Sequence, residues 1–539
     1  MHRDAGDQAV DVGADAYPGS GHVGIMPDGR HNRGVSTRRL HWRIAGVLAG
    51  MAGLATSYAA ATVLTVRASP LVAVAELVIK VTPGSTAERA ISVLGHLDKP
   101  VLLLGVIVLL LACFAWAGSL ARGGWWRAMV VWVVLAGVGL VAVMSQRGAG
   151  VVDVVPVVVG LLTWMSVHPA LTDALRRGLS RPDLQSSERR VFLVVASVVS
   201  VASLGIAVAG RLASAGRRSV ETSRQLLRIP GVTRHSAPPA TSVGLEGVTP
   251  WQTANEDFYR IDTAISVPAI DPSDWKLRIH GMVERELTLT YSQLVARELT
   301  ESWVTLNCVS NEVGGDLVGN ARWSGVRLAG LLANLGVSDE ADCILQTSHD
   351  GWTCATPLAA LTDDRDAMLA VAMNGQPLPI EHGFPVRTVV PGLYGYVSAT
   401  KWVVDMKVGT FADSVGYWTT RGWSSQGPVK IASRIDVPRS GDKVPVGEVS
   451  FGGVAWRQHT GIEAVEVQVD GGAWQRAELA EVPSVDTWVQ WSLTTDLAEG
   501  DHEVRVRAIG ADGETQTDVV RAPAPDGSTG LHTIQVSAG

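Results

Sequence analysis

The sequence is poor in cysteine and lacks the common metal and haem motifs. Four cysteines among 539 residues exclude a scaffold built on disulfides. There is no CxxC, CxxCH or HExxH, which argues against a structural zinc site and against covalently attached haem. The net charge is −7, and Lys and Arg gather only beside apolar segments. This distribution argues against a nucleic-acid partner.

Apolar residues are concentrated in the first ~210 positions, although the mean hydropathy of the whole chain is only +0.19. A helix needs about 20 apolar residues to cross a bilayer. Five segments meet or approach this length: Trp42–Val63, Pro100–Leu120, Met129–Met144, Val151–Leu171 and Val191–Gly210. A shorter stretch, Pro70–Val81, carries two charges and predicts an interfacial helix. We therefore expect a tail at 1–40 and a five-helix transmembrane region at 41–210.

Arginines lie beside alternate ends of these segments, at 38–43, 122–127 and 176–190. Positive flanks favour the cytoplasmic side, so the tail is expected inside and the chain after Gly210 outside. The stretch Ser187–Leu193 contains paired arginines followed by Phe-Leu. It fits either a twin-arginine export signal or an ordinary positive flank of a span.

A haem within the membrane would need histidines at matching depths. His96 lies near the outer end of the second span, and His168 lies near the inner end of the fourth. We therefore predict no haem, and we expect the helices to act as an anchor or a docking surface.

The remaining sequence resembles a soluble protein in two parts. Residues 211–250 are rich in Arg, Ser, Pro and Gly and predict a linker. Residues 251–426 predict a mixed α+β domain, with a strand at Trp275–His280, a capped helix start at Leu289–Leu294 and a hairpin at Met373–Pro379. Residues 427–539 predict a β-sandwich, because Val465, Val467 and Val469 alternate with polar residues before a turn at 470–472. Trp488 and Trp491 are expected between its sheets.

Cys308 is the chemical centre of the α+β part. It ends a β-rich run that starts at Val304 and is followed by a polar, Gly-containing loop to Gly315. A lone cysteine is commonly a small buried apolar residue. The alternative is a ligand, because a thiolate suits a soft or high-valent metal and no general base lies nearby in the sequence. Cys343 and Cys354 flank a turn at 349–351 and could pair if the strand register places them opposite each other.

Three stretches together resemble the sulfite oxidase family. They are Cys308–Asn311 with Asn320–Val326, the long segment Glu381–Trp402, and Asn255–Arg260. The resemblance implies a single molybdenum bound by one molybdopterin and by the sulfur of Cys308, with Arg260 and Trp323 lining the catalytic pocket. It also implies cofactor contacts, carried over position by position, from Asn255, Tyr259, Arg260, Ser348, His382, Arg387, Ser398, Thr400 and Lys401. Residues 427–539 resemble the immunoglobulin-like dimerisation domain of that family.

The sequence departs from the family after Cys308. The family's animal and plant members have an arginine there, whereas this chain has Asn311 to Gly315 with the acid Glu312. A pocket tyrosine also lacks a clear counterpart, and Trp423 is the nearest aromatic. These differences put sulfite itself in question.

Together these patterns predict a membrane-anchored, extracytoplasmic molybdenum oxidoreductase that transfers an oxygen atom to or from a sulfur or nitrogen centre. The substrate is expected to be a small molecule or an oxidised protein, such as one carrying methionine sulfoxide. Electrons would pass to a separate carrier or to quinone, and the last domain would form a homodimer. The alternative is a non-enzymatic surface receptor with an immunoglobulin-like head, which leaves the Cys308 and 381–402 stretches unexplained.

Overall fold

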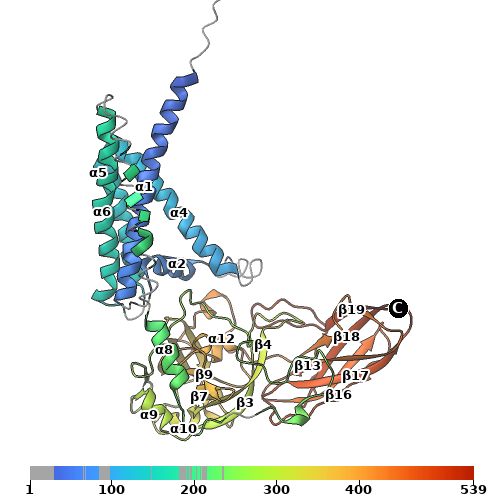
Figure 1. Cartoon of the computed structure of the whole chain (residues 1–539). Helices are drawn as coiled ribbons and strands as arrows, with labels where there is room; N and C mark the ends of the chain where they lie inside the picture. The colour runs from blue at the N-terminus through green and yellow to red at the C-terminus, as the bar shows by residue number, and fades with distance from the viewer. Residues whose placement is uncertain are drawn as a thin grey trace, which may run out of the picture.

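The computed structural model describes residues 29–539, apart from 65, 67, 84–85, 87–96, 147–148, most of 181–214 and 234–235. A helical N-terminal region stands over two sheet-rich parts that lie side by side (Figure 1). The helices of this region are α1 (Gly29–Val63), α2 (Pro70–Val81), α4 (Asp98–Leu120), α5 (Trp125–Met144) and α6 (Val151–Ser180).

Four of these helices are long and apolar enough to cross a membrane, and they coincide with the first four predicted spans. The third is 20 residues long, because it begins at Trp125 rather than Met129. The fifth predicted span, Val191–Gly210, and the paired arginines before it fall largely outside the described residues. The helix predicted to be interfacial is α2, which lies across the end of the bundle that faces the sheet-rich parts (Figure 1).

The described residues of the predicted linker pack against both neighbouring parts. Its residues form α8 (Ala215–Leu226), whose Val220 is buried against the next domain and whose Arg224 donates to the carbonyl of Pro377 at 3.2 Å. Further along, the amide of Glu481 donates to the carbonyl of Ala240 at 2.9 Å. The segment, rich in Pro and Gly, thus packs on the middle part and on the final part and has no core of its own.

The middle part contains two sheets that enclose its core. One has the order β2-β1-β10-β5-β6 and the other β3-β4-β7-β8, with β9 paired to β7. The strands are β1 (Lys276–Gly281), β2 (Leu287–Thr290), β3 (Thr300–Asn307), β4 (Val318–Arg327), β5 (Cys343–Ser348), β6 (Thr353–Pro357), β7 (Met368–Met373), β8 (Gln376–Pro377), β9 (Arg387–Val389) and β10 (Val403–Gly409). Short helices connect them: α9 (Tyr291–Val295), α10 (Leu328–Leu332), α11 (Ala359–Thr362) and α12 (Gly395–Ser398).

Local signals in the sequence produced the predicted elements here. Thr290 caps α9 in a reciprocal capping box with Gln293. Asn374 and Gly375 have φ values of 52° and 72°, as a type I′ turn between β7 and β8 requires.

The last part is a two-sheet β structure, with the orders β11-β13-β17-β16 and β12-β19-β18-β14-β15. The strands are β11 (Ala432–Val437), β12 (Lys443–Val444), β13 (Gly447–Trp456), β14 (Ile462–Val469), β15 (Gln475–Arg476), β16 (Glu478–Leu479), β17 (Val489–Leu497), β18 (Gly500–Gly510) and β19 (His532–Ala538). Valines at alternate positions of β14 and β18 fill the space between the sheets together with Trp491. Trp488 instead packs with Trp251 at the junction with the middle part, where each indole N–H donates to the other residue's carbonyl.

Candidate active site

Cys308 lies where β3 ends and a closed loop begins. Its amide donates to the carbonyl of Leu317 at 2.9 Å, and its carbonyl accepts from the amide of Asn311 at 3.1 Å. The side chain is a buried free thiol. Burial raises the pKa of Cys308, while hydrogen bonds from Ser310 and the charge of Lys401 act to lower it. The loop thus carries one buried sulfur in the positive field of Lys401.

The final β part supports this loop from behind. The hydroxyl of Ser528 donates to the carbonyl of Asn311 at 2.6 Å, and Arg434 donates to the carbonyl of Gly315 at 2.7 Å. Gly314 has a φ of 78°, and a side chain there would collide with the ring of His532. Only glycine therefore fits at position 314. The contacts from Ser528 and Arg434 hold the loop that carries Cys308 in place.

Arg387 is buried on β9 with its charge uncompensated by a carboxylate. Its guanidinium lies over the indole of Trp323, 4.9 Å from the ring centroid, and donates to the carbonyls of His382 and Thr388. None of the ion pairs among the described residues involves Arg387. Burial lowers its pKa to about 10. A buried cation in this state is poised to accept an anionic ligand.

Asp262 organises two further cations beside Arg387. Its Oδ2 is 3.0 Å from Nε of Arg260 and 3.3 Å from Nζ of Lys401. Lys401 and Asp262 are almost buried, whereas Arg260 is exposed. Burial lowers the pKa of Lys401 to about 8, and Asp262 partly offsets this effect. Although burial disfavours its charge, Asp262 keeps a pKa well below the usual range because Lys401 and its other cationic neighbours surround it.

His382 and Asn255 form the adjoining wall. Nε2 of His382 lies 3.0 Å from the carbonyl oxygen of Asn255, whose side-chain oxygen accepts from Asn374 at 2.8 Å. Burial, together with Lys401 and Arg387, lowers the pKa of His382 to about 3. The ring is therefore neutral, and its buried Nδ1 has no hydrogen-bond partner.

Tyr259 links the basic residues to the cysteine. Burial raises its pKa above the usual range, and the charge of Cys308 adds to this effect while that of Arg387 opposes it. A side chain added at Gly395 would lie 3.8 Å from both the Tyr259 hydroxyl and the carbonyl oxygen of Asn307, the residue before Cys308. Burial raises the pKa of Tyr394 to about 12, and its hydroxyl accepts from the amide of Lys430. Trp423, the aromatic residue nearest to a counterpart of the pocket tyrosine in the sequence, packs against Tyr396.

Three predicted cofactor contacts use their hydroxyls internally. Ser398 donates to carbonyls of Leu393 and Tyr394, and Thr400 lies 3.2 Å from the sulfur of Cys354. Ser348 is buried at the end of β5 and accepts from the amide of Asp350 at 3.4 Å. These side chains shape the loops that carry Lys401. Their contact with the cofactor stays a prediction.

Trp323 is fully buried, and its predicted place in the wall of the pocket stays a prediction. Its indole N–H donates to the carbonyl of Val304 at 3.2 Å, and its ring meets Phe258 edge-on. The tryptophan therefore supports Arg387 from beneath. Asp262 was not anticipated, because an aspartate two residues after Arg260 carries no signal by itself in the sequence.

Cys343 and Cys354 do not pair. The register of β5 and β6 places Cys343 opposite Pro357 and Cys354 opposite Gln346, and both cysteines are free thiols. The condition for a disulfide, that the two residues face each other, is not met.

These groups fit a molybdopterin cofactor. A thiol suits a high-valent metal, and three cations balanced by a single carboxylate suit a phosphate. Gly383, with a φ of 110°, brings the backbone so close to Lys401 and Arg387 that a side chain there would collide with them. The buried Asn307 Oδ1 and His382 Nδ1, both without partners, offer polar contacts for a heterocycle.

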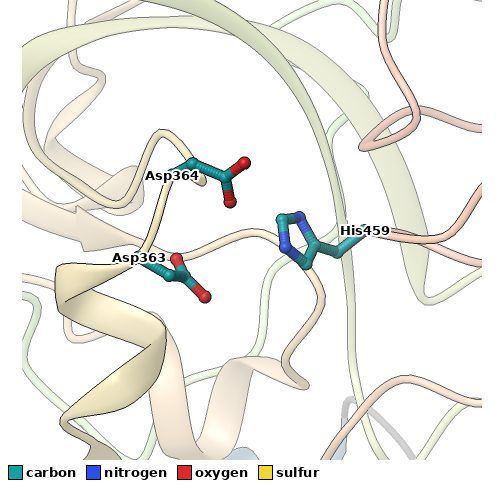
Figure 2. Close-up of side chains that lie close together, drawn as sticks. All are labelled: Asp363, Asp364 and His459. Atoms are coloured by element: carbon teal, nitrogen blue, oxygen red, sulfur yellow. The ribbon is translucent and has the colours of Figure 1, made fainter.

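Another group of potential ligands lies at the junction of the middle and final parts. Figure 2 shows Asp363, Asp364 and His459 pointing toward one another. Nε of Arg365 already donates to both oxygens of Asp363 at 2.9 Å, and Nδ1 of His459 is 3.4 Å from Asp486. These contacts favour an ion-pair cluster at the junction of the two parts over a metal site. A high-valent metal would instead prefer the sulfur of Cys308.

Comparison with known proteins agrees with this assignment. The family model described as "Oxidoreductase molybdopterin binding domain" matches residues 264–418. An uncharacterised oxidoreductase, YuiH of Bacillus subtilis, is 32% identical over 180 residues, which cover 33% of this chain and 87% of that protein. The mitochondrial sulfite oxidase of mouse is 30% identical over 343 residues, 54% of this chain and 62% of the mouse protein.

Among solved structures, the sulfane dehydrogenase SoxCD from Paracoccus pantotrophus is similar, with 23% identity and a TM-score of 0.47, over 57% of this chain and 88% of that one. The chain spans under two thirds of the mouse and human sulfite oxidases, 62% and 56% of their lengths. The match to most of the Bacillus protein establishes the relationship. The chain is therefore an enzyme of the sulfite oxidase family, a molybdopterin-dependent oxidoreductase.

Proposed function

We propose that the protein is a membrane-anchored, extracytoplasmic molybdenum enzyme that transfers an oxygen atom to or from a sulfur- or nitrogen-centred substrate. The observation that carries this proposal is the buried free thiol of Cys308 in the same domain as a cluster of cations, Arg387, Lys401 and Arg260. When bound, the cofactor supplies a metal that exchanges an oxygen atom and two electrons with the substrate. Cys308 would bind this metal, and Arg387, Lys401 and Arg260 would hold the phosphate end of the pterin.

Tyr259 is the residue best placed to act on the substrate. Its raised pKa keeps the phenol protonated, so it donates a hydrogen bond and carries no negative charge. Glu312, the acid that follows Cys308, is exposed on the loop. The Tyr259 hydroxyl can donate to the oxygen of a neutral sulfoxide or N-oxide. A dianion such as sulfite would also need a positive charge, and the loop after Cys308 has no arginine to supply it. The substrate class we propose is such an oxide, small or carried by a protein.

The arrangement of the helices supports the proposed orientation. Figure 1 shows α1 starting, and α4 and α6 ending, at the end of the bundle far from the sheet-rich parts. Arginines gather at this end, where Arg176 donates to the carbonyl of Ala121 at 2.9 Å. Because positive flanks favour the cytoplasm, the catalytic domain would lie outside. Protease added to intact cells should digest residues 427–539, and full protection of these residues would contradict the proposal.

A cavity of about 190 Å³ lies between α2 and the middle part, which is the catalytic part in this proposal. Its walls include Ile79, Lys80, Ser145, Ala264, Trp352 and Tyr417. Its walls also include Glu76, Gln146 and Asp350, so they are mixed in polarity, and either a quinone or a separate carrier remains the proposed electron partner. If a quinone binds here, Trp352→Ala should reduce turnover with a quinone several-fold and leave turnover with an artificial carrier unchanged.

We divide the chain into the regions 1–40, 41–210, 211–250, 251–426 and 427–539, with the last as an immunoglobulin-like domain. Val519 and Val520 are adjacent and exposed on this domain, which supports a homodimer through it. Light scattering on the purified protein should give twice the mass of one chain. Metal analysis and pterin fluorescence on the same sample, followed by assays with sulfite and with sulfoxides, test the proposed function directly.

A further inference from the structure

One side chain of the helical region reaches into the basic cluster of the catalytic part. Lys99, in the first turn of α4, donates from Nζ to Oδ1 of Asp262 at 2.8 Å and to the carbonyl of Ala264 at 2.9 Å. Asp262 is the carboxylate that also contacts Arg260 and Lys401. The side chain of Asp262 is only 5% exposed, whereas that of Lys99 is 29% exposed.

The two oxygens of Asp262 are divided between the regions. Oδ1 accepts from Lys99, whereas Oδ2 accepts from Arg260 and lies 3.3 Å from Lys401. One negative charge is thus shared among three cations, and the contact to Lys401 is the longest of the three. An ammonium has three donors, so Lys401 retains N–H groups that can bind another anion.

We propose that Lys99 is a positioning residue of the cofactor site. By holding Oδ1, it fixes the carboxylate of Asp262 and takes up part of its charge, which leaves Lys401 and Arg260 available to the phosphate of the pterin. Without Lys99, the carboxylate would turn to Lys401 and reduce the positive potential of the cluster. The inference rests on the proposed role of this cluster in holding the cofactor.

A second contact holds the two regions in the arrangement that this role requires. Arg421, in the catalytic part, donates to the backbone carbonyl of Lys80 in α2 at 3.0 Å. The side chain of Lys80 donates elsewhere, to the carbonyl of Ser145 at 3.1 Å. Lys80 is thus a cation at the same junction whose charge does not reach Asp262, and it provides a matched control.

The test uses the full-length protein in detergent and measures its molybdenum and pterin content and the rate of cofactor release after dilution. Lys99→Met and Lys99→Gln should release the cofactor about three- to tenfold faster than the wild type, as expected for weakening one charged hydrogen bond. Gln can still donate to Ala264, so an effect of both variants identifies the lost charge. Lys99→Arg should restore most of the retention, and Lys80→Met should release the cofactor at the wild-type rate.

A double-mutant cycle tests the route through Asp262. If Lys99 acts by neutralising this carboxylate, adding Lys99→Gln to Asp262→Asn should change the release rate little further. The inference would be overturned if Lys99→Met and Lys99→Gln released the cofactor at the wild-type rate, or if Lys99→Arg released it as fast as they do. It would also be overturned if the effects of Lys99→Gln and Asp262→Asn on the release rate were additive. If variants at Arg387 and at Lys401 released the pterin at the wild-type rate, the proposed cofactor cluster itself would be refuted instead.

Discussion

The guanidinium of Arg387 lies over the indole of Trp323, 4.9 Å from the ring centroid, in the interior of the catalytic part. Stacking on an indole stabilises a cation but does not neutralise it. The protein therefore keeps a positive charge in its core at a cost, which a bound anion would offset. Substitution of Arg387 should therefore weaken cofactor binding without lowering the stability of the cofactor-free protein.

Arg387→Met should lower the pterin content at least tenfold while leaving the melting temperature of the cofactor-free protein unchanged or higher. Loss of a charged hydrogen bond to phosphate costs about 1.5–3 kcal/mol, whereas removal of an unpaired buried charge relieves a desolvation penalty. Arg322→Met is the control, because Arg322 is paired with Glu301 at 2.6 Å and should lose stability without losing pterin. A strongly destabilised apo form of Arg387→Met would contradict this explanation.

Cys308→Ser should give a folded protein without activity and with an altered molybdenum spectrum. A hydroxyl is a harder donor than a thiolate and is not ionised near neutral pH, so it binds the metal weakly. X-ray absorption at the molybdenum edge should show one sulfur neighbour fewer. Cys354→Ser provides the comparison, since Cys354 is buried beside Thr400 and should retain the wild-type spectrum. If Cys308→Ser retained the full sulfur count, another ligand would be required.

His382 should make the protein less stable in acid. Its folded-state pKa is about 3, against 6.5 for the unfolded chain, so the unfolded state takes up a proton first. The contribution is therefore fully present above pH 6.5 and is lost as the pH falls from 6.5 toward 3. At pH 5.5 the loss amounts to about 1.4 kcal/mol. His382→Gln should reduce the difference in melting temperature between pH 7.5 and 5.5, and an unchanged difference would refute the assignment.

The site should favour a neutral oxide over sulfite. The chain lacks an arginine between Cys308 and Gly315, and the loss of one charged hydrogen bond to a bound anion costs about 1.5–3 kcal/mol, roughly ten- to a hundredfold in affinity. A sulfoxide, such as oxidised methionine in a protein, requires only a donor such as the Tyr259 hydroxyl. Steady-state assays with artificial electron carriers compare the two substrates. A higher kcat/KM for sulfite would overturn this prediction.

Much of the fold could be predicted, because its signals are local. The Asn-Gly turn after β7 and the capping box at Thr290 depend on the conformations of adjacent residues, and both are present in the structure. The apolar spans depend only on composition over a length. The cofactor-site residues from Asn255 to Lys401 could be proposed because their motifs are long and ordered, but whether each side chain faces the site could not. Ser398 and Thr400 turn inward because neighbouring loops offer them acceptors.

The sequence by itself determined the elements and the family, and it singled out Cys308 as the candidate ligand, since each follows from residues that are close together along the chain. Only the tertiary structure decided which side chains meet. Strand register separates Cys343 from Cys354, and the fold brings Arg387 over the ring of Trp323. Lys99 and Asp262 are 163 positions apart, and no local pattern connects them. Their contact exists because the packing of α4 against the catalytic part places a lysine where a buried carboxylate needs a partner.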